Sequence, residues 1–499
     1  MSRLKIHKGF QLVIIGSGPT AMGMLHRIYS LVDNGSISDD DIKVIILEKE
    51  AEVGGLARSV TDNKGFTWDF GVHIIGLSRY KEFENVINSV VSKWNKIKHS
   101  VKADLAHLFK SENPVNNYVP YPVQHSIPFF PPKIRQKCIS ELKNLQDVHN
   151  ECCSNFAEYS ANIFGNTLLD IFIRPYNRKV SLFFTHTYRE KVGLLTVFVS
   201  VWTVELEEMN TSWAIGRVPC INLASIESLC GRSRHELEMN GSKSSLMCFK
   251  YPKELKGIGE IWKKIAERYP KSIFHLRERV KEIDVESKKI YSEDSKCKTH
   301  AYDYDAILST LPIPELSKIS KVISNVDLKY SKVILVGLGL KHPQCEWTQF
   351  VTWAYFPLPD TIFYRCTFLS NFSDNLTPDS NQFWSILCEI GLRANENIVE
   401  KEVIIRVIEG LKLKGIITDK NEIVNEWFHV LPYGYPIPTV GRDKELKRCH
   451  EVFESHNIYS RGRFGGWKYE ISNQDHCFML GMECADHILF GNDETLYAL

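Results

Sequence analysis

The stretch from Gln11 to Arg58, QLVIIGSGPTAMGMLHRIYSLVDNGSISDDDIKVIILEKEAEVGGLAR, decides the fold. Residues 11–15 form a short apolar run typical of a buried strand, and a second run at residues 41–47 ends in Glu48. Between them Gly16-Ser-Gly-Pro-Thr-Ala-Met-Gly23 opens a helical pattern. This order of strand, glycine turn, helix, strand and acid is the dinucleotide-binding fingerprint. The sequence therefore predicts a nucleotide-binding α/β unit here.

Each part of the fingerprint has a physical role. Gly16 permits a tight turn, Gly18 lets the backbone approach a pyrophosphate, and Ala21 allows the helix to pack closely on the strand. The helix N-terminus presents N–H groups and the positive end of its dipole to the phosphates. Glu48 can accept hydrogen bonds from ribose hydroxyls. The glycines alone would also suit an ordinary tight turn between a strand and a helix.

A second glycine turn, Gly54-Gly-Leu-Ala-Arg58, follows Glu48 and carries a cation. The resulting Glu-x5-Gly-Gly-x2-Arg arrangement resembles that of FAD proteins of the amine-oxidase type. This resemblance implies that the dinucleotide is FAD rather than NAD. It adds Gly55 and Arg58 to the predicted cofactor-binding residues.

The composition is that of a globular protein. The chain has 499 residues, 43% of them hydrophobic and 24% charged, which allows two to four domains and a sizeable core. A net charge of +1 argues against a nucleic-acid partner. The longest apolar run, residues 192–204, is too short to insert into a membrane and is interpreted as a buried helix.

The targeting and cysteine patterns favour a cytoplasmic location. The basic residues at positions 1–8 lead into the first strand rather than into the apolar region of a signal peptide. The 13 cysteines are scattered and form no CxxC motif. We therefore expect reduced thiols, no metal site and a cytoplasmic protein.

The pattern along the rest of the chain predicts an α/β fold with two additions. Helical periodicity dominates residues 133–208, and strand-like runs fill residues 331–390. We therefore expect a Rossmann-like FAD-binding domain, an inserted helical domain and a mostly antiparallel β-sheet domain. The predicted boundaries are residues 1–100, 245–310 and 435–499 for the FAD-binding domain, 136–244 for the helical substrate domain, and 101–135 and 311–434 for the sheet domain.

Three shorter segments carry local predictions. Residues 81–98 have the pattern of an amphipathic helix. The proline density of residues 118–132 predicts a loop or an edge strand rather than a helix. The strand that ends in Ser309-Thr-Leu-Pro312 is typical of a chain returning to its FAD-binding domain.

The most specific segment is Arg461-Gly-Arg-Phe-Gly-Gly-Trp-Lys-Tyr-Glu-Ile-Ser-Asn-Gln-Asp-His476. It closely resembles the Arg-Gly-Arg-Phe-Gly, Tyr-Glu and Asn-Gln-Asp-His signature of the eukaryotic UDP-galactopyranose mutases. The resemblance extends over roughly residues 10–490. The other motifs that match in order are the fingerprint from Gly16, Gly71-x-His73, Pro120-Tyr-Pro-x-Gln124, Arg174-Pro-Tyr-Asn177, Trp213-x3-Arg217, Trp353-x-Tyr355-Phe-Pro, Phe363-Tyr-Arg365, Ser370-Asn371 and Gly434-Tyr-Pro-x-Pro438.

This resemblance implies a flavin-dependent isomerase. The family interconverts UDP-galactopyranose and UDP-galactofuranose, without net redox change, through a flavin N5–sugar adduct. The implied cofactor is FAD, active in its reduced form, with NADPH or NADH as the reductant. The implied partner is a UDP-sugar, and the oligomeric state is left open.

The resemblance also assigns site residues. The implied catalytic residues are His73, on the flavin loop, and Arg217 and Arg365, which match the two diphosphate-binding arginines. Guanidinium groups suit this role because they bind phosphate oxygens in bidentate fashion. The implied substrate-binding residues are Tyr121, Gln124, Asn177, Trp353, Tyr355, Tyr435 and Tyr469. The positions that match residues near the flavin are Arg463, Asn473 and Gln474.

Other interpretations of these residues stay open. An arginine between apolar residues, such as Arg365, needs a buried partner, so a structural ion pair is the alternative to a ligand contact. The chain also departs from the family pattern at Val72, Arg178, Ser181, Leu246, Phe372 and the loop of residues 253–259. The alternatives are an FAD-dependent oxidoreductase of the amine-oxidase type and a non-catalytic homologue that binds flavin or a nucleotide sugar. Paired arginines make little sense for an amine substrate, which favours the mutase.

Overall fold

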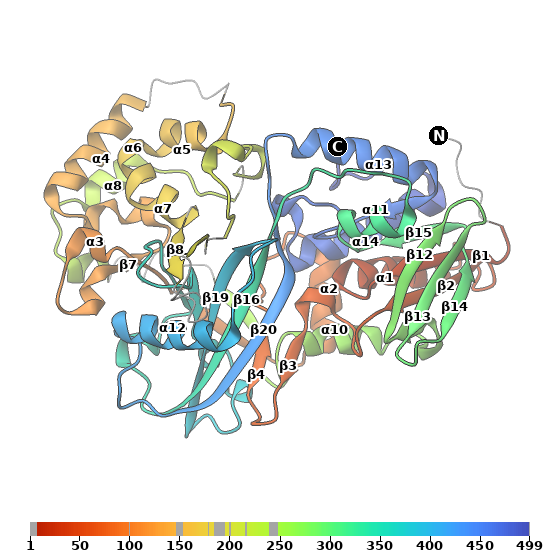
Figure 1. Ribbon diagram of the computed structural model, residues 1–499, viewed down its shortest axis with the longest axis horizontal. Helices are drawn as coiled ribbons and strands as arrows, with labels where there is room; N and C mark the ends of the chain where they lie inside the picture. The colour runs from red at the N-terminus through yellow and green to blue at the C-terminus, as the bar shows by residue number, and fades with distance from the viewer. Residues whose placement is uncertain are drawn as a thin grey trace.

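The computed structural model describes residues 7–98, 100–145, 153–177, 179–183, 195–198, 201–214, 217–238 and 248–498. Its elements form three groups along the longest axis of the molecule (Figure 1). A helical group lies at one end, a sheet of long strands crosses the centre, and a second sheet with its helices forms the other end.

The sheet at the fingerprint end is parallel. Its order is β11-β2-β1-β15-β21, and each neighbouring pair is parallel. Helix α1 (Pro19–Asp33) connects β1 to β2 and buries its apolar face. The predicted strand–turn–helix–strand unit and the return of the chain through β15 are therefore confirmed. The strands are β1 (Phe10–Ile15), β2 (Ile42–Glu48), β11 (Phe274–Leu276), β15 (Ala306–Ser309) and β21 (Ile458–Ser460).

Helix α14 (Gln474–Phe490) packs backbone to backbone against α1. A Cβ added at Gly23 would lie 1.8 Å from the carbonyl oxygen of Phe478, and one at Gly481 would lie 1.9 Å from that of Thr20. No side chain fits at either position, so the glycines set the helix separation. This contact fixes the start of α14 close to the glycine turn of the fingerprint.

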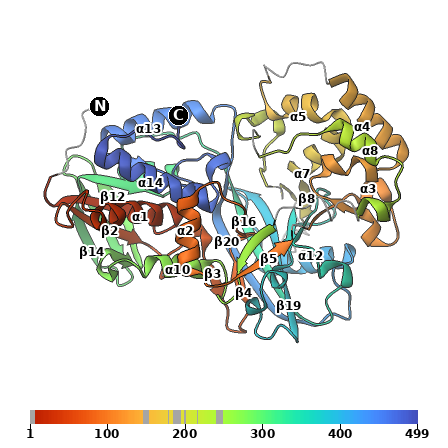
Figure 2. The same cartoon turned by 180° about the vertical axis from the view of Figure 1, so that it is seen from behind.

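The other elements of this end surround the parallel sheet. Helices α2 and α10 lie side by side (Figure 2). They contact each other through Phe83 and Trp262, whose ring centroids are 6.4 Å apart. The helices are α2 (Lys81–Val90), α10 (Gly259–Ala266), α11 (Ile313–Ser320) and α13 (Arg442–Ser455). The antiparallel sheet beside them consists of β12 (Glu278–Asp284), β13 (Lys289–Asp294) and β14 (Thr299–Asp303).

The central sheet has seven strands in the order β20-β16-β19-β18-β17-β6-β7. Its pairs are antiparallel except β17–β6, so the predicted mostly antiparallel sheet is confirmed. Helix α12 (Glu400–Leu413) shares an apolar core with one face. The strands are β6 (Val101–Asp104), β7 (Tyr118–Pro120), β16 (Tyr330–Lys341), β17 (Trp353–Tyr355), β18 (Arg365–Thr367), β19 (Phe383–Arg393) and β20 (Ile423–Pro436).

Two short strand pairs form separate two-stranded sheets. Strand β3 (Ser59–Thr61) pairs with β4 (Thr67–Asp69), and β5 (Trp94–Lys98) pairs with β10 (Cys248–Pro252). Both pairs are antiparallel. The β3–β4 hairpin leads directly into the loop that carries His73.

The helical group contains short helices and one hairpin. Its helices are α3 (Ala106–Phe109), α4 (Pro132–Leu145), α5 (Phe156–Phe164), α6 (Asn166–Leu168), a π-helical turn (Leu169–Ile173), α7 (Arg174–Asn177) and α8 (Leu223–Leu229). The hairpin pairs β8 (Val180–Phe183) with β9 (Leu195–Phe198). The interpretation of residues 192–204 as a helix is therefore wrong where the structure describes them, because residues 195–198 pair with β8 instead.

Two local predictions also need correction. The helix predicted over residues 81–98 ends at Val90, because residues 94–98 pair with β10. Residues 118–132 do contain the predicted edge strand, β7, but residues 123–129 form 3₁₀ turns. Proline is tolerated in such short turns, whereas it disrupts a continuous α-helix.

Candidate active site

The first part of the site is a cradle of backbone at the start of α1. Gly16 has φ +96°, and a Cβ there would lie 2.1 Å from Oγ1 of Thr310. The first turn of α1 has neither an acidic residue nor a capping side chain, so its N–H groups and dipole can face an anion. Ala21 is fully buried in this helix, as predicted for close packing.

Glu48 and the second glycine turn border the same cradle. Glu48 ends β2 and accepts hydrogen bonds from the backbone N–H and Oγ of Ser17, at 2.9 and 2.7 Å. Gly18 and Gly55 touch, since a Cβ at Gly55 would lie 3.1 Å from Cα of Gly18. Arg58 donates to the carbonyl of Gly55 at 3.1 Å and also pairs with an acid. The structure thus brings together the residues predicted from the fingerprint.

The loop of residues 461–468 closes the cradle from the side of α14. A Cβ at Gly462 would lie 2.6 Å from Oγ1 of Thr20, in the first turn of α1. Arg463 donates to Oγ of Ser472 at 2.8 Å and to the carbonyl of Gly434 at 3.1 Å. Its guanidinium carbon lies 5.0 Å from the ring centre of Tyr435. Arg463 therefore stands between the cradle and the aromatic residues of the site.

His73 follows the β3–β4 hairpin and lies near both Arg463 and Arg365. Its Nδ1 is buried and has no hydrogen-bond partner among the described residues. Burial first, and then the positive charges of Arg463 and Arg365, lower the pKa of His73 to about 3. The side chain is therefore neutral at physiological pH, and its buried nitrogen is suited to a polar ligand.

Arg365 is held by a buried carboxylate. Its Nε and Nη2 donate to Oε1 and Oε2 of Glu389 at 2.7 and 2.6 Å, and the two residues are opposite each other on β18 and β19. The Glu389 side chain is only 2% exposed. Oε2 also accepts from Tyr364 at 3.0 Å, and Nη2 of Arg365 donates to Tyr435 at 3.3 Å. The structural ion pair expected as an alternative for Arg365 is therefore present, with Glu389 as the partner. It orients the guanidinium toward the hydroxyl of Tyr435.

The His73 loop lies against the same ion pair. Gly71 has φ +119°, and a Cβ there would lie 3.6 Å from Oε2 of Glu389. The loop therefore passes beside the carboxylate that holds Arg365. This proximity places the His73 loop beside the centre of the long sheet.

Arg217 reaches the site from the helical group. Its guanidinium donates to the carbonyl oxygens of Tyr469 and Glu470 and to Oδ1 of Asn473, at distances of 2.7–3.1 Å. It also lies 5.1 Å from the ring centre of Tyr469. The Arg217 side chain, called the latch here, therefore links the helical group to three residues just before α14.

A group of aromatic rings, called the aromatic lining here, lies near both arginines. Tyr435 and Tyr469 have ring centres 6.0 Å apart, and Trp202 packs on both. The ring centres of Tyr355 and Tyr121 are 4.6 Å apart. Tyr355 is also directly opposite Arg365 in the β17–β18 pair. This lining is suited to a planar base and a sugar, with cations between.

Three other predicted residues have different local roles. Trp353 shares a face of β17 with Tyr355 and contacts Phe249 at 5.8 Å between ring centres. Gln124 donates to the carbonyl of Pro219 at 2.9 Å, two residues after Arg217. The buried Asn177 side chain donates to the carbonyl of Ile173, at the end of the π-helical turn that precedes α7.

Gln474 is turned away from the arginines. Its Oε1 accepts a hydrogen bond from Nε1 of Trp262 at 2.8 Å. Asn473, in contrast, is the N-cap residue just before α14 and accepts a hydrogen bond from Arg217. Among the positions that depart from the family pattern, Phe372 is buried and Val72 is half-buried. Arg178, Leu246 and the side chain of Ser181 lie outside the described residues.

Sequence reasoning missed three residues of the site. Glu389 is the partner of Arg365, Tyr364 donates to it, and Trp202 completes the aromatic lining. Glu389 could have been identified from the sequence, because a lone acid in an apolar strand needs a buried cation. No sequence feature indicated Trp202, since it lies in the apolar run that was interpreted as a helix.

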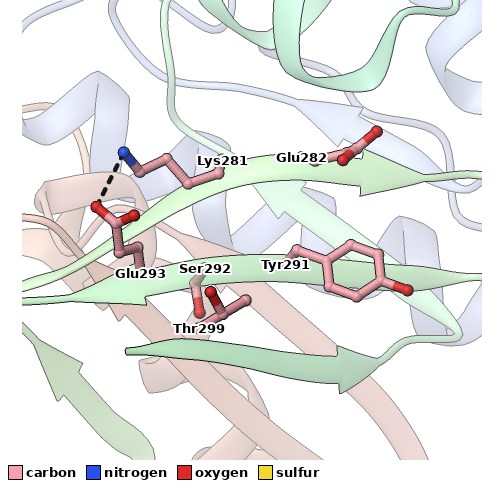
Figure 3. Close-up of a pocket in the computed structure, with 6 residues that line it drawn as sticks. All are labelled: Lys281, Glu282, Tyr291, Ser292, Glu293 and Thr299. Atoms are coloured by element: carbon pink, nitrogen blue, oxygen red, sulfur yellow. Dashed lines mark ion pairs between the residues drawn. The ribbon is translucent and has the colours of Figure 1, made fainter. Parts of the chain in front are cut away.

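The cavities found elsewhere do not include these residues. One of about 370 Å³ lies on β12–β14, where Lys281 and Glu293 form an ion pair at 3.1 Å (Figure 3). Another of about 210 Å³ surrounds Lys414, which pairs with Asp104 and Asp360. In the described ranges, no group of three or more His, Cys, Asp or Glu side chains could hold a metal ion. No helix in these ranges is both long and apolar enough to cross a membrane.

Comparisons with known proteins agree with this geometry. A family model described as flavin containing amine oxidoreductase matches residues 29–348, more than half of the chain. The chain is similar to a crystal structure of reduced UDP-galactopyranose mutase, with 28% sequence identity and a TM-score of 0.79, over 98% of this chain and 96% of that one.

Two further solved structures share the fold alone. A putative protoporphyrinogen oxidase from Exiguobacterium sp. 255-15 has 15% identity and a TM-score of 0.67, over 97% of this chain and 99% of that one. A CLA-producing fatty acid isomerase from P. acnes has 12% identity and a TM-score of 0.57, over 97% of this chain and 99% of that one. The predicted α/β fold class, with its helical and antiparallel parts, is confirmed by these likenesses together with the topology.

Proposed function

The chain belongs to the flavin-containing amine oxidoreductase family, and from that premise we propose that it is a flavin-dependent isomerase that interconverts UDP-galactopyranose and UDP-galactofuranose. The observation that carries the proposal is the convergence of Arg217 and Arg365 on Tyr435 and Tyr469, next to the flavin loop. Two fixed guanidinium groups match a diphosphate, and the surrounding rings match a base and a sugar.

The residues of the cradle fit FAD. Gly16, Gly18 and the N-terminus of α1 would receive the pyrophosphate, and Glu48 would exchange its contacts with Ser17 for ribose hydroxyls. The unpartnered Nδ1 of His73 would face the flavin ring. When bound and reduced, FAD supplies a nucleophilic N5, with NADPH or NADH as the proposed reductant.

The chain's own residues would handle the charge of the departing UDP. Arg365 is held in place by Glu389 and faces Tyr435, so its cation is preorganised. Arg217 would approach from the opposite side, next to Tyr469. Cations fixed in this way stabilise a transition state in which the diphosphate gains charge more than they stabilise the bound substrate.

The remaining residues would orient the substrate. We assign Tyr121, Gln124 and Asn177 to the uridine, and Trp353 and Tyr355 to the sugar. His73 is neutral, so it adds no third positive charge beside the arginines. The proposal keeps the three-domain division of the chain and a cytoplasmic location.

UDP should stabilise the folded protein if this assignment is correct. At a concentration of one hundred times Kd, a ligand adds about 2.7 kcal/mol to the free energy of unfolding. A thermal melt with UDP should therefore show a higher Tm than one with uridine, which lacks the diphosphate. The Arg365→Lys variant should lose most of that difference, because the fork geometry is lost.

The second candidate is an FAD oxidoreductase of the amine-oxidase type, which the family match also favours. It predicts that amines, rather than UDP, raise the Tm. It also predicts hydrogen peroxide release when amines are added in air. Such a result, with no effect of UDP, would contradict the isomerase.

A further inference from the structure

Residues 491–498, called the strap here, follow α14 and turn back along it. The backbone N–H groups of Thr495 and Leu496 and the hydroxyl of Thr495 all donate to Glu483 of α14, each at 2.8 Å. The strap is therefore anchored to the helix that it follows. Beyond this anchor it contacts the loop of residues 461–468 at several points.

The strongest contact joins Glu494 to Arg461, the first residue of that loop. Arg461 is 3% exposed and donates from Nε to Oε1 of Glu494 at 2.8 Å and from Nη2 to Oε2. Its Nη2 also donates to Glu454 at 2.8 Å. The carboxylates raise the pKa of Arg461 well above its usual value, against the opposing effect of burial. Glu494 is thus one of two acids that compensate this buried charge.

Tyr497 makes a second, independent contact. Nη1 of Arg461 faces Nδ1 of His450 at 3.2 Å, so that nitrogen must accept and the other ring nitrogen carries the proton. Nε2 of His450 then donates to the hydroxyl of Tyr497 at 2.8 Å, and that hydroxyl donates to the carbonyl of Gly466 at 2.7 Å. Tyr497 is 5% exposed. This series of hydrogen bonds runs from Arg461 through His450 and Tyr497 to the backbone of the loop.

The loop held by these contacts also packs through side chains of its own, since Phe464 and Trp467 are buried in the core. It contains Gly462, Gly465 and Gly466, which have no side chains of their own to pack. On its inner side, Gly462 lies against Thr20 in the cradle, and Arg463 reaches the Tyr435 ring. On the outer side of the loop, the strap contacts Arg461 and Gly466. Displacement of the loop would open the cradle at the start of α1.

We propose that Glu494 and Tyr497 are positioning residues that hold this loop over the bound flavin and thereby limit the rate at which the flavin leaves. This inference rests on the proposed flavin site. The two residues touch neither the cradle nor the aromatic lining in the structure. Their effect is exerted through Arg461 and the backbone of Gly466.

Flavin release from the variants Glu494→Ala and Tyr497→Phe tests this proposal. The purified holoproteins are diluted at 25 °C, and released FAD is followed by its fluorescence. We expect Glu494→Ala to release FAD about tenfold faster than wild type, because it loses a charge-assisted pair. Tyr497→Phe, which loses two neutral hydrogen bonds, those to His450 and to the carbonyl of Gly466, should show a smaller increase. Glu494→Gln, which can still accept from Arg461, should lie between Glu494→Ala and wild type.

The matched control is Asp493→Ala, which removes an exposed carboxylate from the same segment. It should leave the release rate unchanged. Visible circular dichroism of the bound flavin should change in Glu494→Ala but not in the control, since it reports the loop against the cofactor. If Glu494→Ala does not fold, Tyr497→Phe decides the outcome.

Two results would overturn the proposal, and they are distinguishable. If wild type holds FAD and the variants lower Tm but release FAD at the wild-type rate, the strap is merely structural and the proposed function stands. If wild type purifies without any flavin and binds none when FAD is added, the flavin site itself is wrong.

Discussion

Arg365→Ala is expected to lower turnover of UDP-galactofuranose on the order of a hundredfold, by removing one preorganised cation from the departing diphosphate. The same change should lower the melting temperature, because it leaves Glu389 buried and unpaired. The Glu389 side chain is 2% exposed, and breaking such a pair from one side costs about 3–5 kcal/mol. Arg365 thus combines the ligand role and the structural ion pair, which were alternatives at the level of sequence.

A double variant separates the two effects. In Arg365→Ala/Glu389→Gln the buried negative charge is gone, so we expect most of the stability to return while turnover stays low. Arg365→Lys should rescue turnover only in part, because the fork geometry is lost. FAD content should stay at the wild-type level in all three, since the cradle lies in other elements. Recovery of turnover together with stability in the double variant would show that Arg365 serves the fold alone.

Arg217→Ala should also lower turnover on the order of a hundredfold, with little loss of stability. The side chain is only half-buried, and its partners are two carbonyl oxygens and an amide, so no buried acid is left unpaired. The measurement is turnover together with Tm and FAD content. A large drop in Tm with loss of flavin would mean that Arg217 is a structural latch rather than a catalytic residue.

The latch gives this variant a second readout. In wild type, UDP should hold Arg217 and the helical group against residues 469–473 and slow limited proteolysis of the helical group, as closed lids commonly do. Without the guanidinium, UDP should no longer protect it. Arg217→Lys should protect partially. Identical cleavage of wild type with and without UDP would argue against closure.

The fold could be predicted from the sequence where one local rule was sufficient. The fingerprint combines glycines, apolar strands and an acid in one short stretch, so β1, α1 and β2 lie where they were expected. The strand-like runs of residues 331–390 likewise predicted a mostly antiparallel sheet. The segment of residues 94–98 was predicted wrongly, because its strand exists only through pairing with β10, which is far away in the sequence.

The site was predicted less fully, for a similar reason. The residues of the cradle came from local spacing, but the arginines and tyrosines came from a resemblance, since their elements are distant from each other in the chain. Neither source identified Glu389, which meets Arg365 only through the β18–β19 register. The contacts of Arg217 with residues 469–473 likewise need the folded chain, because they join the helical group to α14.

The most direct test of the central claim compares the oxidised and the dithionite-reduced holoprotein on UDP-galactofuranose, without oxygen, with product analysis by chromatography. Only the reduced protein should form UDP-galactopyranose, of the same mass as the substrate, because flavin N5 is nucleophilic only when the ring is electron-rich. Equal rates from both forms would contradict this expectation. So would a reduced protein that carries full FAD and binds UDP but forms no product, which would identify the chain as a non-catalytic binder.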